Sequence, residues 1–237
     1  MKYAIIAAGE GSRLASEGVE APKPLVEVCG EKLIDRLVRM FVEAGAEEIC
    51  AICNGLRPEV AAHLEKKACY TDVPLKYVVE TTPSSMHSLY ALSKEIGAEP
   101  FILTTVDTVF SGAALEGYAA EFEKAARSGA CLMGVTRFVD DEKPLYVDAD
   151  ESGAVRGFHD GGGPWPYVSG GIYGLVPGAM GVLSQCIARG ESRMRNFQRA
   201  IVAAGIPVRA YDMGKVMDID HAGDIAKAEE FIKTAGC

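Results

Sequence analysis

The sequence predicts an α/β fold with a mainly parallel central sheet and helices on both faces. Two observations carry this prediction. Short apolar segments alternate with longer segments whose apolar residues recur at helical spacing, and glycines or prolines stand at the junctions. Such alternation is typical of parallel sheets with crossover helices. At 237 residues, the chain is long enough for one large domain, and no repeat or long linker divides it.

The first half of the chain is expected to alternate between strand and helix. Apolar residues at helical spacing from Leu33 to Val42 end at Gly45, which supplies a helix stop. Pro58 suits the first turn of the next helix. Expected strands are 3–8, 47–53, 75–79 and 101–106, and expected helices are 33–42, 57–68 and 86–96. Ligands bind such sheets at the carboxyl ends of the strands, so polar residues there are functional candidates.

The pattern changes after an expected helix at 113–127. A strand at 131–136 precedes two short strands, 145–147 and 154–158, whose connecting turn predicts a hairpin. The loop 160–166 carries the only tryptophan, Trp165, and is expected to be a flexible lid. The remaining expected strands are 169–174, 207–211 and 216–219, and the remaining expected helices are 178–188, 193–204 and 222–234.

Composition narrows the class of protein. The formal net charge of -9 argues against nucleic-acid or anionic membrane partners. No apolar segment approaches the roughly 20 residues of a membrane span, and no signal-peptide pattern opens the chain. Seven scattered cysteines fit a reducing cytoplasm better than a disulfide framework. Cys50-x-x-Cys53 has metal-site spacing, but it lies within an expected strand and is interpreted as core. We therefore expect a cytoplasmic protein whose oligomeric state the sequence leaves open.

The first 25 residues hold the most informative pattern. An apolar strand runs into Gly9-x-Gly11, where the backbone can turn tightly and approach a ligand closely. Ser12 and Arg13 add a hydroxyl and a fixed cationic fork. Lys23 stands between two prolines that restrict its backbone. A strand that opens into glycines, a serine and two cations is typical of a phosphate site.

Other glycine-loop interpretations fit less well. The dinucleotide fingerprint requires a third glycine where this chain has Leu14, and the P-loop pattern is absent. A plain strand-to-helix turn would explain the glycines alone. It would not explain the segment Pro22-Lys23-Pro24-Leu25, which favours the phosphate site.

The two-part pattern resembles the signature of the sugar-phosphate nucleotidyltransferases, also called nucleotide-sugar pyrophosphorylases, whose close relatives activate choline phosphate. The pattern comprises 7–14, Ala-Ala-Gly-x-Gly-Ser-Arg-Leu, and 22–25, Pro-Lys-Pro-Leu. The resemblance implies a Rossmann-like nucleotidyltransferase fold in three layers, as a single domain over 1–237 with a nucleotide-binding half at 1–110 and an acceptor-binding half at 111–237. It implies a nucleoside triphosphate and a phosphorylated small molecule as partners. The implied nucleotide-binding residues are Ala7, Ala8, Gly9, Gly11, Ser12, Arg13 and Ser85.

Asp107 is the first carboxylate candidate. It directly follows the apolar strand 101–106, where it is poorly placed for packing and well placed for a metal. It could instead cap a helix or form a turn. The resemblance implies that it holds Mg²⁺ on the nucleotide phosphates, although Val106 stands where the family often has glycine.

Asp218-Ile219-Asp220 is the second candidate. Strand alternation would put both carboxylates on one face, where they repel unless a cation lies between them. One metal ligand plus one helix cap is the alternative. Residues 218–225 resemble the family ending Asp-x-Asp-x-x-x-Asp-[Leu/Ile]. That resemblance implies metal ligation by Asp218, with Asp220 second, and Asp224 is expected to cap or anchor the last helix.

Two further segments should contact substrates. The polar loop 80–88 precedes a helix, so Ser84 or Ser85 is expected as its N-cap, and the family reads base and ribose here. Segment 169–174 resembles the family's glycine-containing acceptor strand, which implicates Gly170 and Gly171. Many relatives carry Glu-Lys-Pro before this strand, whereas this chain has Phe-His-Asp at 158–160. Two explanations are open: the acceptor phosphate relies on Arg193, Arg195 or Lys215, of which Arg195 is chosen, or the acceptor is not an ordinary hexose 1-phosphate.

The expected reaction is attack of a phosphorylated acceptor on the α-phosphorus of a nucleoside triphosphate, with pyrophosphate as the leaving group. Such transfers need positioning and charge neutralisation, so Arg13 and Lys23 are the expected catalytic residues and Mg²⁺ the expected cofactor. A sugar 1-phosphate is the first acceptor choice, and choline phosphate or another small phosphorylated alcohol is the second. A catalytically silent nucleotide-sugar sensor is a third possibility, and a Rossmann dehydrogenase fits least.

Overall fold

The computed structural model describes residues 1–139 and 143–235. The first half of the sheet is built around β1 (Lys2–Ala7). This strand pairs in parallel with β4 (Glu48–Cys53) on one side and β6 (Phe101–Thr105) on the other, and β5 (Leu75–Val79) extends the sheet beyond β4. The carboxyl ends of these four strands therefore meet at one edge. The parallel arrangement predicted for this half is confirmed.

The second half of the sheet mixes directions. β11 (Tyr167–Leu175) runs antiparallel to β6, to β8 (Cys131–Thr136) and to β9 (Tyr146–Ala149). β9 and β10 (Val155–His159) form the predicted hairpin, while β12 (Val208–Asp212) pairs in parallel with β8. Hairpin connections allow antiparallel pairing without a crossover helix, which explains the change in pattern after residue 136. Since β11 pairs with β6, both halves share one sheet.

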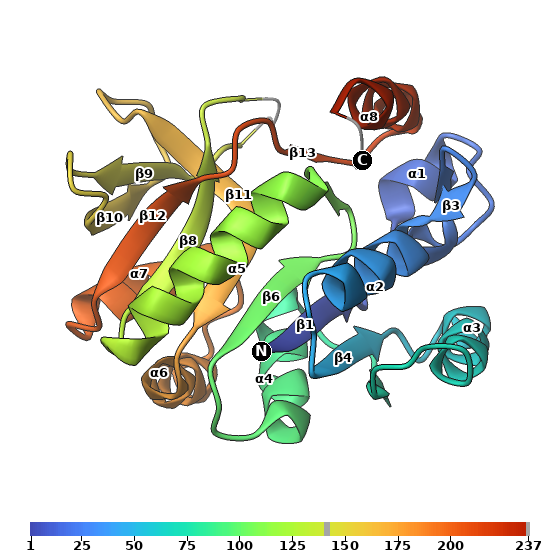
Figure 1. Ribbon diagram of the computed structural model, residues 1–237, viewed down its shortest axis with the longest axis horizontal. Coiled ribbons are helices and arrows are strands. Elements are labelled where there is room, and N and C mark those ends of the chain that lie inside the picture. Colours follow the sequence, from blue (N-terminus) through green and yellow to red (C-terminus); the bar gives the residue numbers. More distant parts are fainter. Residues whose placement is uncertain (140–142, 236–237) are drawn as a thin grey trace.

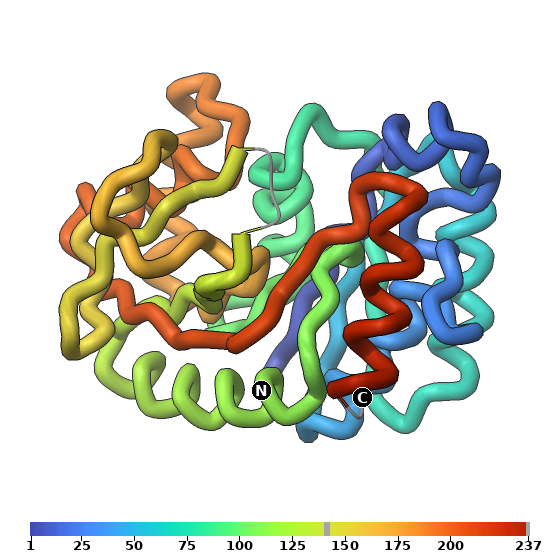
Figure 2. Tube along the Cα trace, turned by 90° about the horizontal axis from the view of Figure 1, so that it is seen from above, coloured from blue at the N-terminus to red at the C-terminus, as the bar shows by residue number. Residues whose placement is uncertain are grey.

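Helices cover both faces of this sheet, as the sequence predicted (Figures 1 and 2). α2 (Leu33–Glu43) and α5 (Gly112–Arg127) lie on one face. On the other face lie α4 (Ser85–Ile96), α6 (Pro177–Ala188) and α7 (Met194–Ala203). α3 (Pro58–Ala68) flanks β5. The fully buried rings of Tyr3 and Phe41 stack with 4.4 Å between centroids, which fixes α2 against β1.

Several short elements are absent from the sequence prediction. They are α1 (Ser12–Ser16), the 3₁₀ turn η1 (Lys23–Leu25), β2 (Glu27–Val28), β3 (Glu31–Lys32) and β7 (Thr108–Val109). The expected strand at 216–219 is shorter than predicted, because β13 covers only Met217–Asp218. β13 pairs antiparallel with β7, which aligns Asp218 with Thr108. This two-residue pairing carries the end of the chain back to the first half of the sheet.

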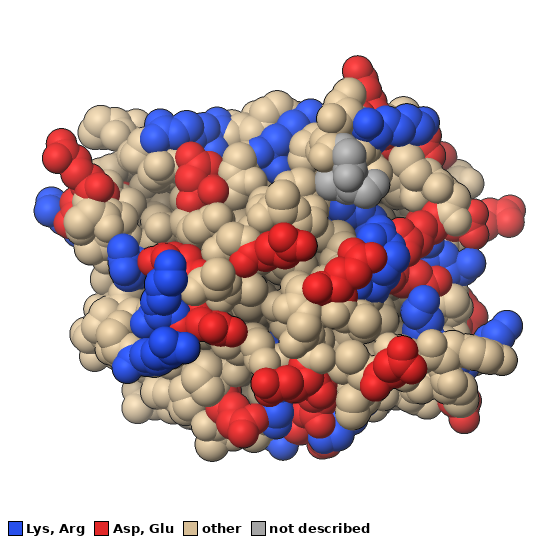
Figure 3. All heavy atoms as spheres, viewed as in Figure 1, with Lys and Arg blue, Asp and Glu red and all other residues tan. Residues whose placement is uncertain are grey.

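The last helix, α8 (Ala222–Ala235), lies beside α1 and the β2–β3 hairpin (Figure 2). The backbone amide of Cys29 in the hairpin turn donates to the Glu229 carboxylate of α8 over 3.1 Å. Acidic and basic side chains are interspersed over the face shown in Figure 3. Within the ranges 1–139 and 143–235, no helix combines the length and apolar character needed to cross a bilayer.

Candidate functional site

The loop after β1 brings its glycines close to Lys23. Gly11 has a φ of +63°, a conformation that glycine adopts without steric cost. A Cβ atom on Gly11 would lie 3.2 Å from the Cβ of Lys23, so the two segments approach more closely than most side chains allow. Ser12 opens the short helix α1, and Arg13 follows it. Gly11 therefore lets the glycine loop and the proline-flanked lysine share one site.

Lys23 is the centre of this site. Its Nζ lies 2.7 Å from Oδ2 of Asp107 and 2.7 Å from Oδ1 of Asp220, and its side chain is only 10% exposed. Burial of the ammonium acts to lower the pKa of Lys23, but attraction to the two carboxylates outweighs it and the net pKa is raised. Arg13 Nη1 lies 2.9 Å from Oδ2 of Asp220. Asp220 is thus held by Arg13 and Lys23, the two cations of the signature segment, residues 7–25.

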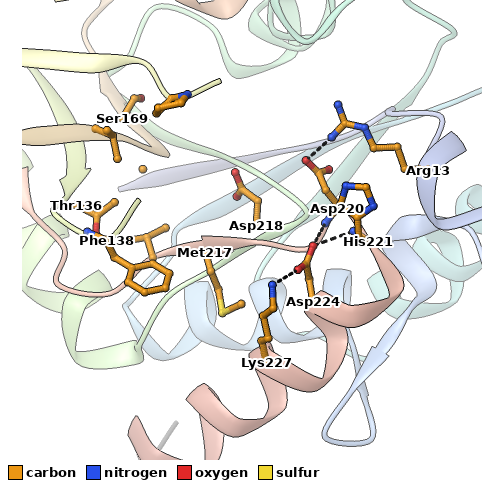
Figure 4. Close-up of a pocket in the computed structure, with 14 residues that line it drawn as sticks. Arg13, Thr136, Phe138, Ser169, Met217, Asp218, Asp220, His221, Asp224 and Lys227 are labelled. Atoms are coloured by element: carbon orange, nitrogen blue, oxygen red, sulfur yellow. Dashed lines mark hydrogen bonds and ion pairs between the residues drawn. The ribbon is translucent and has the colours of Figure 1, made fainter. Parts of the chain in front are cut away.

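The β7–β13 pairing places Asp218 beside Asp107. The backbone amide of Ile219 donates to the carbonyl oxygen of Asp107 over 3.1 Å, and Asp218 aligns with Thr108. Surrounding protein atoms, and then repulsion from Asp107, raise the pKa of Asp218 to about 7. Its side chain nevertheless opens into a cleft (Figure 4). Two acidic groups from distant parts of the chain therefore meet next to Lys23.

These carboxylates fit a divalent cation that also binds phosphate. Within the described ranges, no group of three or more His, Cys, Asp or Glu side chains comes together as a complete metal site. Mg²⁺ is usually held by only one or two carboxylates plus substrate phosphates and water. Asp107 and Asp218 supply such a pair, because the β7–β13 pairing brings them together. The residues present are therefore compatible with Mg²⁺.

One cleft lies over the glycine loop. It is lined by residues 8–11 and 82–85, together with Lys23 and Asp107. Ser85 lines this cleft as the sequence predicted, and Ser84 is the N-cap of α4 because its hydroxyl accepts the backbone N–H of His87. Three of the predicted nucleotide-binding residues are not among the residues lining this cleft: Ala7 is buried within β1, Ser12 begins α1, and Arg13 lines a neighbouring cleft.

A second cleft adjoins the first, because Asp220 in its lining is ion-paired with Lys23 in the lining of the first. It is lined by Arg13, Asp218 and Asp220, and also by side chains from the second half of the chain. Those side chains include Thr136, Phe138, Ser169, His221, Asp224 and Lys227. Figure 4 shows the carboxylates of Asp218 and Asp220 directed to the same side of the chain, as alternation predicted.

The two glycines of β11 occupy different environments. Gly170 lines the second cleft. Gly171 does not, but its φ is +71° and a Cβ on it would lie 2.6 Å from Thr108 Oγ1. Gly171 therefore allows β11 to pack closely against β7, the strand that positions Asp218.

The cations expected to meet the acceptor lie outside the residues lining this cleft. The guanidinium of Arg195 is ion-paired with Asp160 and donates to the carbonyl oxygen of Lys143. Lys215 Nζ lies over the rings of Phe138 and Phe231, at 4.8 and 5.1 Å from their centroids. Arg193 precedes α7 as an exposed residue.

Lys227, which the sequence analysis missed, lines the second cleft and lies 2.9 Å from Asp224 Oδ1. Its position three residues after Asp224, on the same helix face, was the available signal.

Contacts between α1 and the start of α8 hold the signature segment in place. The Glu17 carboxylate accepts the backbone N–H of Ala222 over 2.7 Å and lies 2.6 Å from His221 Nδ1. Hydrogen bonding to His221 lowers the pKa of Glu17, and the same contact raises the pKa of His221. Asp224 Oδ2 accepts the backbone N–H groups of Asp220 and His221, so the predicted anchoring role of Asp224 is confirmed.

The loop 160–166, expected to be a flexible lid, is anchored at both ends in the structure. Trp165 stacks on His159 with 4.2 Å between ring centroids and 5° between ring planes. At its start, Asp160 is ion-paired with Arg195 and Arg199.

Comparison with known proteins identifies the family. The model of the MobA-like NTP transferase domain matches residues 3–166. The chain belongs to this family. It is therefore a nucleotidyltransferase, as the glycine-loop signature predicted.

Curated relatives of this MobA-like chain carry names that refer to different nucleotides. The CMP-5'-(3-aminopropyl)phosphonate synthase of Streptomyces rubellomurinus is 30% identical over 162 residues, which cover 68% of this chain and 24% of that protein. The N-acetylmuramate alpha-1-phosphate uridylyltransferase of Caulobacter vibrioides is 29% identical over 187 residues, 73% of this chain and 74% of that protein. The chain thus spans about a quarter of the first relative and three quarters of the second.

The fold also matches solved structures. The inositol-1-phosphate CTP transferase from T. maritima superposes with a TM-score of 0.83 and 19% identity, over 99% of this chain and 95% of that one. At this identity the likeness supports the fold, and the predicted Rossmann-like nucleotidyltransferase architecture is confirmed.

Proposed function

We propose that this nucleotidyltransferase moves a nucleoside monophosphate from a nucleoside triphosphate to the phosphate of a sugar 1-phosphate and releases pyrophosphate. The observation that carries the proposal is the meeting of Lys23, Asp107 and Asp218 where two clefts adjoin. The glycine-loop cleft would take the triphosphate, and the second cleft would take the acceptor. The family relation supports the reaction type.

The bond changes assign roles to the residues. An oxygen of the acceptor phosphate forms a bond to the α-phosphorus, the bond from that phosphorus to the α–β bridging oxygen breaks, and pyrophosphate leaves with the electron pair. Backbone amides at Gly9 and Gly11 would bind the triphosphate at the carboxyl end of β1. Lys23 would neutralise charge that builds up on the α-phosphate, and Arg13 charge on the leaving pyrophosphate.

We further propose Mg²⁺ as the cofactor, bound by Asp107 and Asp218. When bound, it would neutralise the phosphate oxygens and orient the α-phosphate for in-line attack. Asp220 is a weaker candidate, because both of its carboxylate oxygens are already engaged by Lys23 and Arg13. Arg195 would reach the acceptor only by exchanging its contact with Asp160.

A small phosphorylated alcohol such as choline phosphate is the second candidate acceptor. Three carboxylates, of Asp218, Asp220 and Asp224, line the second cleft beside Arg13 and Lys227, and the chain has no lysine between Lys143 and Lys215. A compact acceptor with a cationic group would suit that lining. The Streptomyces relative has an aminopropyl phosphonate in its name, which supports a small acceptor with an amine group.

Pyrophosphate release tests the proposal. The chain would be incubated with Mg²⁺ and each pairing of ATP, CTP, GTP, UTP or dTTP with sugar 1-phosphates and choline phosphate. We expect release that requires one triphosphate and one acceptor and stops when EDTA is added. Triphosphate binding without release from any pair would instead favour a catalytically silent nucleotide-sugar sensor.

A further inference from the structure

Asn54 lies between the two loops that wall the glycine-loop cleft. It is the first residue after β4, one position beyond the register pairs Ala7–Cys53 and Cys53–Val79. β4 is flanked by β1 and β5, so the side chain stands between the ends of both neighbours. It is 3% exposed and does not line the cleft itself.

The amide of Asn54 joins these loops directly. Its Nδ2 donates to the carbonyl oxygen of Ala8 over 3.1 Å. Its Oδ1 accepts the Thr81 hydroxyl over 2.8 Å and the backbone N–H of Leu56 over 3.0 Å. Both acceptor positions of the carbonyl oxygen are therefore used, which fixes the orientation of the amide. One side chain thus ties the start of the glycine loop to the start of the 81–85 loop.

Neighbouring residues keep this link short. A Cβ on Gly55 would lie 3.3 Å from Thr81 Oγ1, so glycine leaves room for the Thr81 hydroxyl. The backbone amide of Glu80 donates to the carbonyl oxygen of Cys53 over 3.0 Å, which continues the β4–β5 ladder up to the link. A buried side-chain amide that is hydrogen-bonded to several partners holds those partners in one arrangement.

We infer that Asn54 is a positioning residue that sets the separation between the triphosphate loop and the 81–85 loop, and thereby the affinity and base discrimination of nucleotide binding. This inference rests on the proposed function. A nucleoside triphosphate would contact both loops, so a fixed separation between them would strengthen its binding. Inorganic tripolyphosphate would contact the glycine loop only, so its binding would depend little on that separation.

The alternative is that Asn54 only stabilises its own turn. Its Oδ1 accepts the Leu56 amide, and its backbone carbonyl accepts the Arg57 amide. A residue with that role alone would affect stability without distinguishing between ligands. The comparison of two ligands therefore separates the roles.

The test measures dissociation constants of the preferred nucleoside triphosphate and of tripolyphosphate by calorimetry, for the full chain and for Asn54→Ala and Thr81→Val. We expect each variant to bind the nucleotide about tenfold more weakly, as loss of one buried hydrogen bond predicts, with tripolyphosphate affinity almost unchanged. Thr81→Ser keeps the hydroxyl and should restore nucleotide affinity. In Asn54→Ala and Thr81→Val, the ratio of kcat/KM for the best triphosphate to that for the second-best triphosphate should fall as well.

Two further variants sharpen the result. Adding Thr81→Val to Asn54→Ala should have no extra effect, because the hydroxyl has already lost its partner. Tyr118→Phe is the matched control: it removes the buried hydrogen bond to the Leu132 carbonyl oxygen and should lower stability with no change in nucleotide affinity. Thr81→Val keeps the test available if Asn54→Ala fails to fold.

Unchanged nucleotide affinity in Thr81→Val, or an equal loss for both ligands, would overturn the inference. A wild-type chain that binds no nucleoside triphosphate would instead overturn the proposed function on which it rests.

Discussion

The ammonium of Lys23 lies 2.7 Å from the carboxylate of Asp107, although 84 positions separate them in the sequence. The contact joins the glycine-loop segment to the carboxyl end of β6. It places a cation that cannot easily be neutralised beside a carboxylate suited to metal binding, because the pKa of Lys23 is raised by its acidic partners. The cation and the metal ligand of the proposed reaction are thus adjacent before any substrate arrives.

Replacing Lys23 with methionine should remove the main cationic contribution to the transition state. We expect Lys23→Met to lower kcat by roughly 10² to 10³, as loss of one electrostatic contact to developing charge does in other enzymes. Initial rates of pyrophosphate release would measure this. Lys66→Met, on the exposed surface of α3, should leave the rate unchanged. Normal turnover by Lys23→Met would remove Lys23 from the mechanism.

Replacing Asp218 with asparagine should raise the stability of the fold and lower the catalytic activity. The pKa of Asp218 is raised from 3.8 to about 7 in the folded chain, so the folded state holds this proton more tightly than the unfolded state does. Ionisation therefore costs stability, and the cost grows as pH rises from about 4 to about 7. Because the Asp218 side chain opens into a cleft, solvent screens most of this cost. Asp218→Asn should therefore melt only roughly 2–4 °C higher at pH 8, which corresponds to about 1 kcal/mol, and the gain should be smaller at pH 5.

Metal-dependent turnover should be lost in the same variant. Thermal melts at both pH values, with Asp72→Asn as the exposed control, check the prediction. A lower melting temperature for Asp218→Asn at pH 8 would contradict this reading of the site.

Gly171 should not tolerate a side chain. Alanine there would combine an unfavourable positive φ with a Cβ 2.6 Å from Thr108 Oγ1. We expect Gly171→Ala to cost about 1–3 kcal/mol and to displace β7, so that turnover falls as well. Gly181→Ala in α6 meets nothing within 4 Å and should be neutral or stabilising. Equal melting temperatures for the two variants would refute this reading of β11.

Replacing Arg195 should weaken the binding of the acceptor and leave the binding of the nucleotide unchanged. We expect Arg195→Ala to raise the KM of the acceptor about tenfold with the nucleotide dissociation constant unchanged, as loss of a charged hydrogen bond predicts. Steady-state kinetics with each substrate varied in turn would show the split. Arg193→Ala, at an exposed position two residues earlier, should have little effect. If neither arginine matters, the acceptor phosphate must rely on cleft cations such as Lys227.

The sequence predicted the regular elements well, because their signals are local. Strands at 75–79 and 131–136 agree with the structure residue for residue, and the helix ends differ from those predicted by at most two residues. Apolar periodicity and glycine stops lie within each segment, so no distant contact is needed to recognise them.

The arrangement of the site was harder to predict from the sequence than the helices and strands were. β7 and β13 are two residues long and carry no periodicity, yet their pairing brings Asp218 beside Asp107. Arg195 is engaged by Asp160, which lies in the loop after β10, 35 positions away in the sequence. Asn54 gave no sequence signal as a link between loops. In each case the decisive contact joins residues that only the folded sheet brings together.

The most direct test of the central claim is ³¹P NMR of the complete reaction with the preferred triphosphate and acceptor. The account predicts that the acceptor phosphate and the α-phosphate resonances convert to a coupled pair of diphosphate resonances, with one pyrophosphate formed per product and none without acceptor. Conversion of the triphosphate to diphosphate and inorganic phosphate, or unchanged spectra from every pair that binds, would contradict nucleotidyl transfer at this site.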